Sequence, residues 1–171
     1  MTVPRAWGSG AGVLAASLLA FSLCGAVWGL LRPAYRGTLT ADGNLQLDSA
    51  FNVEFSSFIS FVVATGLVAT VMSLSAFIVV PDSRGPGMLW WVVFVSFVSA
   101  LAFIAVGEVT SSLRYPMPDV DALSEGDFVT IVPALAPGVG LLAAPFMAAL
   151  AYWCSALVSP DEEPSELELV R

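Results

Sequence analysis

The chain contains no histidine and no lysine, so all six of its basic residues are arginines. Histidine is the commonest general acid–base residue in enzymes, and lysine is a frequent nucleophile. Without either residue the serines have no evident base to activate them, and the sequence predicts no catalytic site. The arginines also form no cluster. Nucleic acid is therefore excluded as a partner, and a polybasic lipid anchor is absent.

Cysteine is scarce, and both cysteines fall inside apolar runs. Cys24 and Cys154 have no neighbouring histidine or cysteine at a metal-ligand spacing, so no metal and no cofactor is expected. If the runs are antiparallel helices, the two residues differ in depth by about 13 Å. A disulfide needs a Cα separation of about 6 Å, so we expect both thiols to stay free.

Apolar length is what the sequence does have. Of its 171 residues, 57% are hydrophobic and 12% are charged, with a net charge of −8. A soluble domain carries about a quarter charged residues. A helix of about 20 apolar residues crosses a bilayer core of about 30 Å. Four runs meet that length and predict an all-α, multi-pass protein of the cell membrane with transmembrane helices over 11–31, 55–80, 88–113 and 133–158.

The fourth run differs from the others because it contains three prolines. Proline is tolerated in a membrane helix where neighbours satisfy the freed carbonyl groups, so Pro145 predicts a kink. Pro133 and Pro137 predict a frayed first turn or a re-entrant segment before the helix.

A small β-hairpin is predicted between the first two helices, within residues 32–54. Asp42-Gly43 is a strong hairpin turn signal. A three-residue turn that begins at Asp42 pairs Leu39 with Leu47, whereas a two-residue turn places these leucines on opposite faces. The first register is favoured because register follows the buried face. An isolated hairpin is marginally stable, so an apolar face needs a partner surface. The candidate contact residues are Leu39, Leu45 and Leu47.

Two segments are acidic: the loop that follows the third run, and the tail 159–171. The spacing of the acids in the loop does not match a calcium-binding loop, so no metal is expected there. A solvated loop that attracts a basic partner is the favoured interpretation. The acids of the loop are Asp119, Asp121, Glu125 and Asp127.

Glu108 is the only ionisable residue well inside a run, which makes it the leading candidate for a functional site. It lies five residues before Leu113 and therefore near one end of its helix. We predict an ion pair with Arg32, Arg36 or Arg114, which belong to the same end. A proton- or ligand-coupled role and a neutral or snorkelled carboxyl remain the alternatives.

The first run contains Gly25-x-x-x-Gly29, a spacing that lets two helix backbones approach closely. The contact can form within the chain or between chains, and packing within the chain is favoured. Aromatic residues also gather near the ends of the runs, as in an interfacial belt. They are Trp28, Tyr35, Trp90, Trp91, Tyr115, Tyr152 and Trp153.

Arginine counts do not orient the chain, because three arginines fall on each side of the membrane. Both termini are expected in the cytoplasm, since the two longer connections, including the hairpin, then lie together on the extracytoplasmic side.

The connections resemble those of a family of actinobacterial membrane proteins catalogued as domain of unknown function number 2567. The resemblance is carried by Arg32-Pro-Ala-Tyr-Arg-Gly37, by Arg84-Gly-Pro-Gly-Met88, and by Leu113-Arg-Tyr115 followed by Val120-Asp-Ala122. It implies a four-helix topology with the N-terminus inside, and no reaction. An acidic residue at the position of Glu108 is not part of the family pattern.

Together these features predict a non-catalytic accessory or assembly subunit of a larger membrane complex. The expected partners are other integral membrane subunits and lipids. For an actinobacterium the candidate hosts are the respiratory cytochrome bc–oxidase supercomplex and the envelope lipid-export machinery. The alternative is a small oligomeric transporter or an envelope-lipid-handling protein, which the proline-rich fourth run and Glu108 favour.

Overall fold

The computed structural model describes residues 5–40, 45–47, 52–116 and 126–159. It is mostly helical, and four of its helical segments are long and apolar enough to cross a membrane, which confirms that part of the prediction. The helices are α1 Arg5–Leu31, α2 Val53–Val79, α3 Pro86–Arg114 and α4 Ala143–Val158, the last continuing the 3₁₀ turn η3 Gly138–Leu142.

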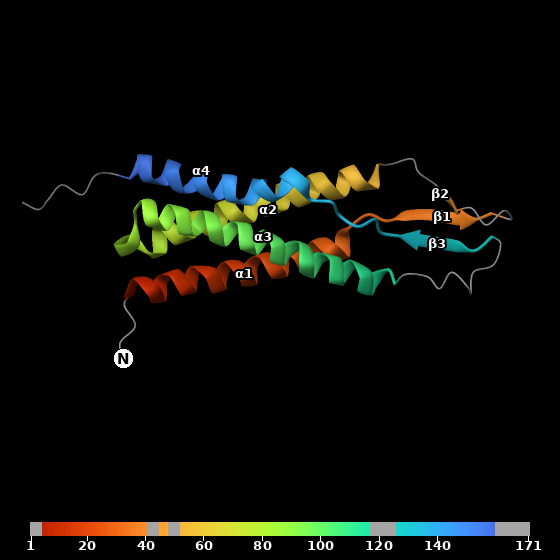
Figure 1. The fold of residues 1–171 in the computed structure, drawn as a ribbon, viewed down its shortest axis with the longest axis horizontal. Helices are drawn as coiled ribbons and strands as arrows, with labels where there is room; N and C mark the ends of the chain where they lie inside the picture. The colour runs from red at the N-terminus through yellow and green to blue at the C-terminus, as the bar shows by residue number, and fades with distance from the viewer. Residues whose placement is uncertain (1–4, 41–44, 48–51, 117–125, 160–171) are drawn as a thin grey trace, which may run out of the picture.

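The helices alternate in direction along an elongated bundle (Figure 1). The largest contacts join α1 to α3 and α2 to α4, and each of these pairs is parallel (Figure 1). A short 3₁₀ turn, η1 Pro81–Ser83, links α2 to α3 at one end, which we name the link end. A small sheet lies at the opposite end, which we name the sheet end (Figure 1).

The sheet has three antiparallel strands in the order β2-β1-β3. They are β1 Tyr35–Leu39, β2 Leu45–Leu47 and β3 Phe128–Ile131. The predicted hairpin is present as β1 and β2, but its predicted register is wrong. Leu39 lies opposite Leu45, and Leu47 lies opposite Gly37.

Strand β1 is not part of an isolated hairpin, because a third strand binds its other edge. The backbone N–H of Leu39 donates to the carbonyl of Asp127 over 3.2 Å, and the N–H of Gly126 donates to the carbonyl of Leu39 over 2.9 Å. Leu39 is thus held by β3, and strand β1 ends there instead of continuing towards the turn. The predicted turn residues 42–44 lie outside the described residues.

Strand β3 corrects the prediction that only a loop connects the third apolar run to the fourth. A short apolar run cannot be assigned to strand or helix by periodicity alone. Pro145 is also not a kink inside an α-helix, because α4 begins at Ala143 and Pro145 occupies its first turn. The N–H groups of a first helical turn have no intrahelical acceptor, so proline costs little there.

Small and hydroxylated residues share the interior of the bundle with aromatic side chains such as Phe61 and Phe103. On α2 every fourth residue is buried, and this row includes Ser57, Thr65 and Ser73. The hydroxyl of Ser73 donates to the carbonyl of Ala148 over 2.7 Å, which ties α2 to α4. Large apolar side chains such as Leu67 cover the outside. This distribution is typical of helices that pack in lipid, where small residues permit close approach.

Candidate functional site

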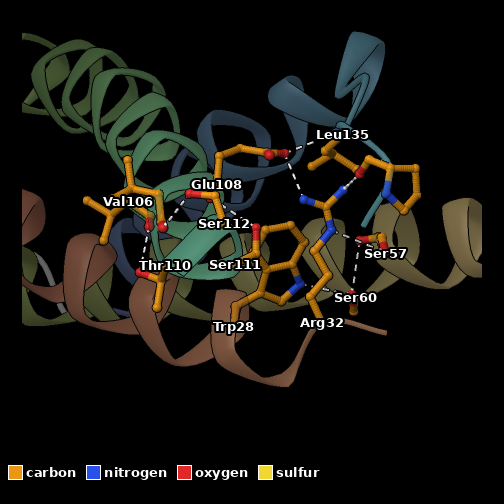
Figure 2. A network of polar contacts seen from close by, with 12 residues as sticks. Trp28, Arg32, Ser57, Ser60, Val106, Glu108, Thr110, Ser111, Ser112 and Leu135 are labelled. Carbon is orange, nitrogen blue, oxygen red and sulfur yellow. Dashed lines mark hydrogen bonds and ion pairs between the residues drawn. The ribbon is translucent and has the colours of Figure 1, made fainter. Parts of the chain in front are cut away.

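A buried arginine forms the centre of the polar cluster at the sheet end. Arg32 directly follows the last residue of α1, and Pro33 comes next. A residue before proline is disfavoured in the helical conformation, so the chain leaves the helix at this point. The side chain of Arg32 runs in among the other segments (Figure 2) and is only 2% exposed.

The guanidinium of Arg32 contacts four separate segments (Figure 2). Its Nη1 donates to Oε1 of Glu108 on α3 over 2.7 Å, and its Nε donates to Oγ of Ser57 on α2 over 3.4 Å. Its Nη2 donates to the carbonyl of Pro133, in the segment that leads into α4. Its Cζ lies 5.0 Å from the ring centroid of Trp28 on α1. One cation thus joins α1, α2 and α3 to the segment that precedes η3 and α4.

Glu108 neutralises the charge of Arg32 and also binds the segment before α4. Its Oε1 accepts a second hydrogen bond, over 3.0 Å, from the backbone N–H of Leu135. Of the three arginines named from the sequence, the structure brings Arg32 to Glu108. Arg36 on β1 and Arg114 at the end of α3 are exposed, and neither pairs with Glu108 among the described residues.

Arg32 and Glu108 are buried to different extents, and this difference determines what the ion pair does for stability. The side chain of Arg32 is 1% exposed, whereas that of Glu108 is 36% exposed. A buried cation without a counter-charge is strongly destabilising, so the carboxylate compensates the cost of burying Arg32. Hydrogen bonds between ionised partners are short and strong, and they fix the geometry of this end.

Trp28 belongs to the core. Its position near a helix end predicted a place in an interfacial belt, and for this residue that prediction is wrong. Trp28 is 8% exposed, and its indole N–H donates to Oγ of Ser60 over 2.9 Å. Its ring centroid lies 5.5 Å from that of Phe103 and 6.3 Å from that of Phe61. This aromatic cluster separates the Arg32 group from the middle of the bundle.

Gly25 and Gly29 are used within the chain, against α3. A Cβ atom built on Gly25 would collide with the carbonyl oxygen of Phe103, and one built on Gly29 with that of Gly107. A Cβ atom on Gly107 would in turn lie 2.7 Å from the ring of Trp28. These glycines bring the two backbones together, and that approach brings Arg32 within reach of Glu108.

The remaining predicted site residues are not part of this cluster. Leu39 lies in β1, and Leu45 and Leu47 lie in β2. Asp119 and Asp121 lie outside the described residues. Sequence reasoning missed the backbone acceptor at Pro133 and the backbone donor at Leu135, because neither is visible in side-chain chemistry.

The groups of the cluster hold segments of the chain together. Among the described residues, no three His, Cys, Asp or Glu side chains lie close enough to hold a metal ion. The hydroxyl of Ser60 donates to the carbonyl of Ser57 over 3.0 Å, so it is engaged with backbone. Cys24 and Cys154 are free and exposed.

No protein-family model matches this chain, and no curated protein or solved structure matches it either. The resemblance to the actinobacterial family therefore remains an expectation from the connecting segments.

Proposed function

We propose that the protein is a non-catalytic accessory or assembly subunit of a larger membrane complex. The observation that carries the proposal is the sheet, which extends past the helix ends at one end of the bundle (Figure 1). Phe128 on β3 is 86% exposed there. Exposed aromatic residues are enriched at the centres of protein interfaces, and they contribute much of the binding energy.

Strand β3 also presents a backbone edge. It pairs with β1 on one side, and in the described part of the chain no strand pairs with its other side. Leu39 donates to Asp127, and antiparallel pairs alternate between bonded and non-bonded. The backbone groups of Phe128 and Thr130 therefore face away from β1. Such an edge can accept a strand from a partner protein.

The Arg32 cluster supports the same proposal. Its ionised groups bind one another and the backbone, so they serve to fix the platform that carries the sheet. A rigid platform favours binding because little conformational freedom is lost on association.

The alternative is a small oligomeric transporter or an envelope-lipid-handling protein, and one observation favours it. The second carboxylate oxygen of Glu108 has no partner among the described residues, and the side chain is 36% exposed. Under this alternative Glu108→Gln abolishes activity in the intact cell. Under the accessory role Glu108→Gln lowers the yield of folded protein but leaves partner capture intact.

The family resemblance suggests the host and the orientation. With an N-terminus inside, the sheet lies on the extracytoplasmic face of the cell membrane. The respiratory cytochrome bc–oxidase supercomplex is the first host to test, and the envelope lipid-export machinery is the second.

The test is purification of the affinity-tagged protein in mild detergent, with mass spectrometry of the proteins that accompany it. We expect membrane subunits to co-purify with the wild type. Phe128→Ser removes the exposed ring and should reduce their recovery about tenfold or more, as loss of a dominant interface residue does. Phe128→Tyr, which keeps the ring, is the control.

A backbone variant tests strand addition directly. Thr130→Pro removes an N–H group that faces away from β1, and edge strands tolerate proline at such positions. We expect it to weaken partner recovery while the bundle stays folded, with Thr130→Ser as the control. Recovery of the wild type as a lone monomer in several mild detergents would refute the accessory role.

A further inference from the structure

A cavity of about 490 Å³ lies at the link end, opposite the sheet. It is an open cavity, bordered by the connection from α2 to α3 and by the last turns of α4. Its lining combines one cation with mostly apolar side chains. The residues that matter here are Arg84, Leu89, Trp153, Ala156 and Ser159.

The cation is held in place before any ligand arrives. Nε of Arg84 donates to the carbonyl of Phe77 over 3.0 Å, and its Cζ lies 4.4 Å from the centroid of the Phe77 ring. That ring is in turn fixed by an edge contact with Tyr152, with centroids 5.2 Å apart. The side chain of Arg84 thus lies against the protein and does not extend freely into solvent.

In the described part of the chain, the two Nη groups of this arginine have no hydrogen-bond partner. Within the described residues, Arg84 forms no ion pair, although Asp82 is only two residues away. An arginine whose position is fixed and whose two Nη groups have no other partner is suited to bind an oxyanion through two parallel hydrogen bonds.

Two exposed tryptophans lie near the helix ends on either side of this cation. Trp90 is 71% exposed near the start of α3, and Trp153 is 56% exposed near the end of α4. Tryptophan is enriched at the boundary between the hydrocarbon and the headgroups. Both residues lie about one turn from their helix ends. Arg84, in the link just beyond those ends, is therefore at the depth of lipid phosphates.

We propose that this cavity binds an anionic phospholipid. The phosphodiester accepts hydrogen bonds from the guanidinium of Arg84, and the first methylene groups of one chain pack on Leu89, Trp153 and Ala156. A soluble phosphate would gain little from these apolar walls. The inference is independent of the accessory role, because it concerns the opposite end of the bundle.

Because the chain as a whole is negatively charged, binding of an anionic lipid depends on the local positive charge at this site. A protein with a net charge of −8 is repelled by an anionic surface. Selectivity for an anionic lipid must therefore come from a single fixed cation, and it must be sensitive to loss of that cation.

The test is native mass spectrometry of the purified full-length chain in detergent micelles. Phosphatidylglycerol and phosphatidylcholine of equal chain length are the two probes. We expect the wild type to retain phosphatidylglycerol in preference, and Arg84→Gln to weaken its binding about tenfold or more. Arg84→Lys should keep part of the affinity, because it keeps the charge but loses the fork.

The matched control is Arg114→Gln. Arg114 is also exposed and also lies over an aromatic ring, with its Cζ 5.2 Å from the centroid of Tyr115, but it is at the sheet end. Its loss should leave phosphatidylglycerol binding unchanged. A second variant, Ala156→Trp, fills the apolar side of the cavity while Arg84 remains, and it should displace the lipid as well.

Four results would overturn the proposal. The first is that Arg84→Gln and Ala156→Trp bind phosphatidylglycerol as tightly as the wild type does. The second is that the wild type binds phosphatidylglycerol and phosphatidylcholine equally. Millimolar inorganic phosphate displaces the lipid completely, which indicates a site for a soluble anion. Binding is seen only after the acids at 161–163 are neutralised, which indicates that the acidic segment following Ser159 occupies the cavity.

Discussion

Helix α1 carries the Gly-x-x-x-Gly spacing twice, and its two halves use it differently. Gly25 and Gly29 lie in contact with the backbone of α3, so close that a Cβ atom would collide with carbonyl oxygens. Gly8 and Gly12 are exposed, and a Cβ atom on either would meet nothing within 4 Å. The spacing permits close approach, but the opposite helix decides whether it occurs.

The residues of α3 account for the difference. Opposite Gly29 the partner is another glycine, Gly107, so the two backbones touch. Towards the link end the partner is Trp91, whose indole N–H donates to the carbonyl of Gly10 over 3.0 Å. A large side chain there replaces a backbone contact. On the α2 side, Gly12 lines a cavity of about 460 Å³.

Removal of the counter-charge of buried Arg32 should produce the largest difference between the sheet end and the link end of the bundle. Glu108→Ala leaves Arg32 buried and uncompensated, so we expect the free energy of unfolding to fall by about 3–5 kcal/mol. The control at the link end is Asp82→Ala, since Asp82 is exposed and forms no ion pair among the described residues. We expect its free energy of unfolding to change by no more than about 0.5 kcal/mol. Titration of mixed micelles with a denaturing detergent measures both, and equal effects would contradict the comparison.

The glycine pairs offer a test with the same substitution in each half. Gly29→Val forces α1 away from Gly107 and should lower the free energy of unfolding by about 1–3 kcal/mol, the usual cost of overpacking. Gly12→Val introduces no collision and should change it by less than about 0.5 kcal/mol. The same detergent titration applies. A large loss at Gly12 would show that the open half is closed in the membrane, by a partner or by a second copy.

Ser99, on α3 between the two halves, should give the smallest effect. Among the described residues its hydroxyl is the one buried side-chain polar atom without a hydrogen-bond partner. A buried unsatisfied hydroxyl costs stability, so Ser99→Ala should raise the free energy of unfolding by about 1 kcal/mol. Ser73→Ala is the control, since it removes a hydrogen bond to Ala148 and should be destabilising. A loss of stability in Ser99→Ala would indicate a buried water bound to this hydroxyl.

Much of the helical architecture could be predicted because length and apolarity are local properties. The runs that became α2 and α3 are close to their predicted bounds for this reason. Arg32 could be named as one of three partners for Glu108, because charges near one end of a bundle can be located by counting residues. The choice among the three depends on Pro33, on the close approach at Gly29 and on the carbonyl of Pro133, which is information in three dimensions.

The sheet could be predicted only in part. Asp42-Gly43 indicated a hairpin, but the register was wrong by two residues, since Leu39 pairs with Leu45. On its other side Leu39 bonds to Asp127 and Gly126, far along the sequence, which the hairpin pattern does not show. Strand β3 was missed because Phe128–Ile131 resembles the start of an apolar helix. A strand that exists through a distant partner leaves no local signal.

The pairing of β1 with β3 constrains how the chain can assemble. Strand β1 is synthesised before α2 and β3 after α3, so β1 must wait until two further helices are in place. A chain in which either helix failed to cross a membrane would leave the two strands on opposite sides. The hydrogen bonds that join Leu39 to Asp127 and to Gly126 could then not form. Closure of the sheet is thus a late, non-local step. In a membrane it requires that both α2 and α3 have crossed first.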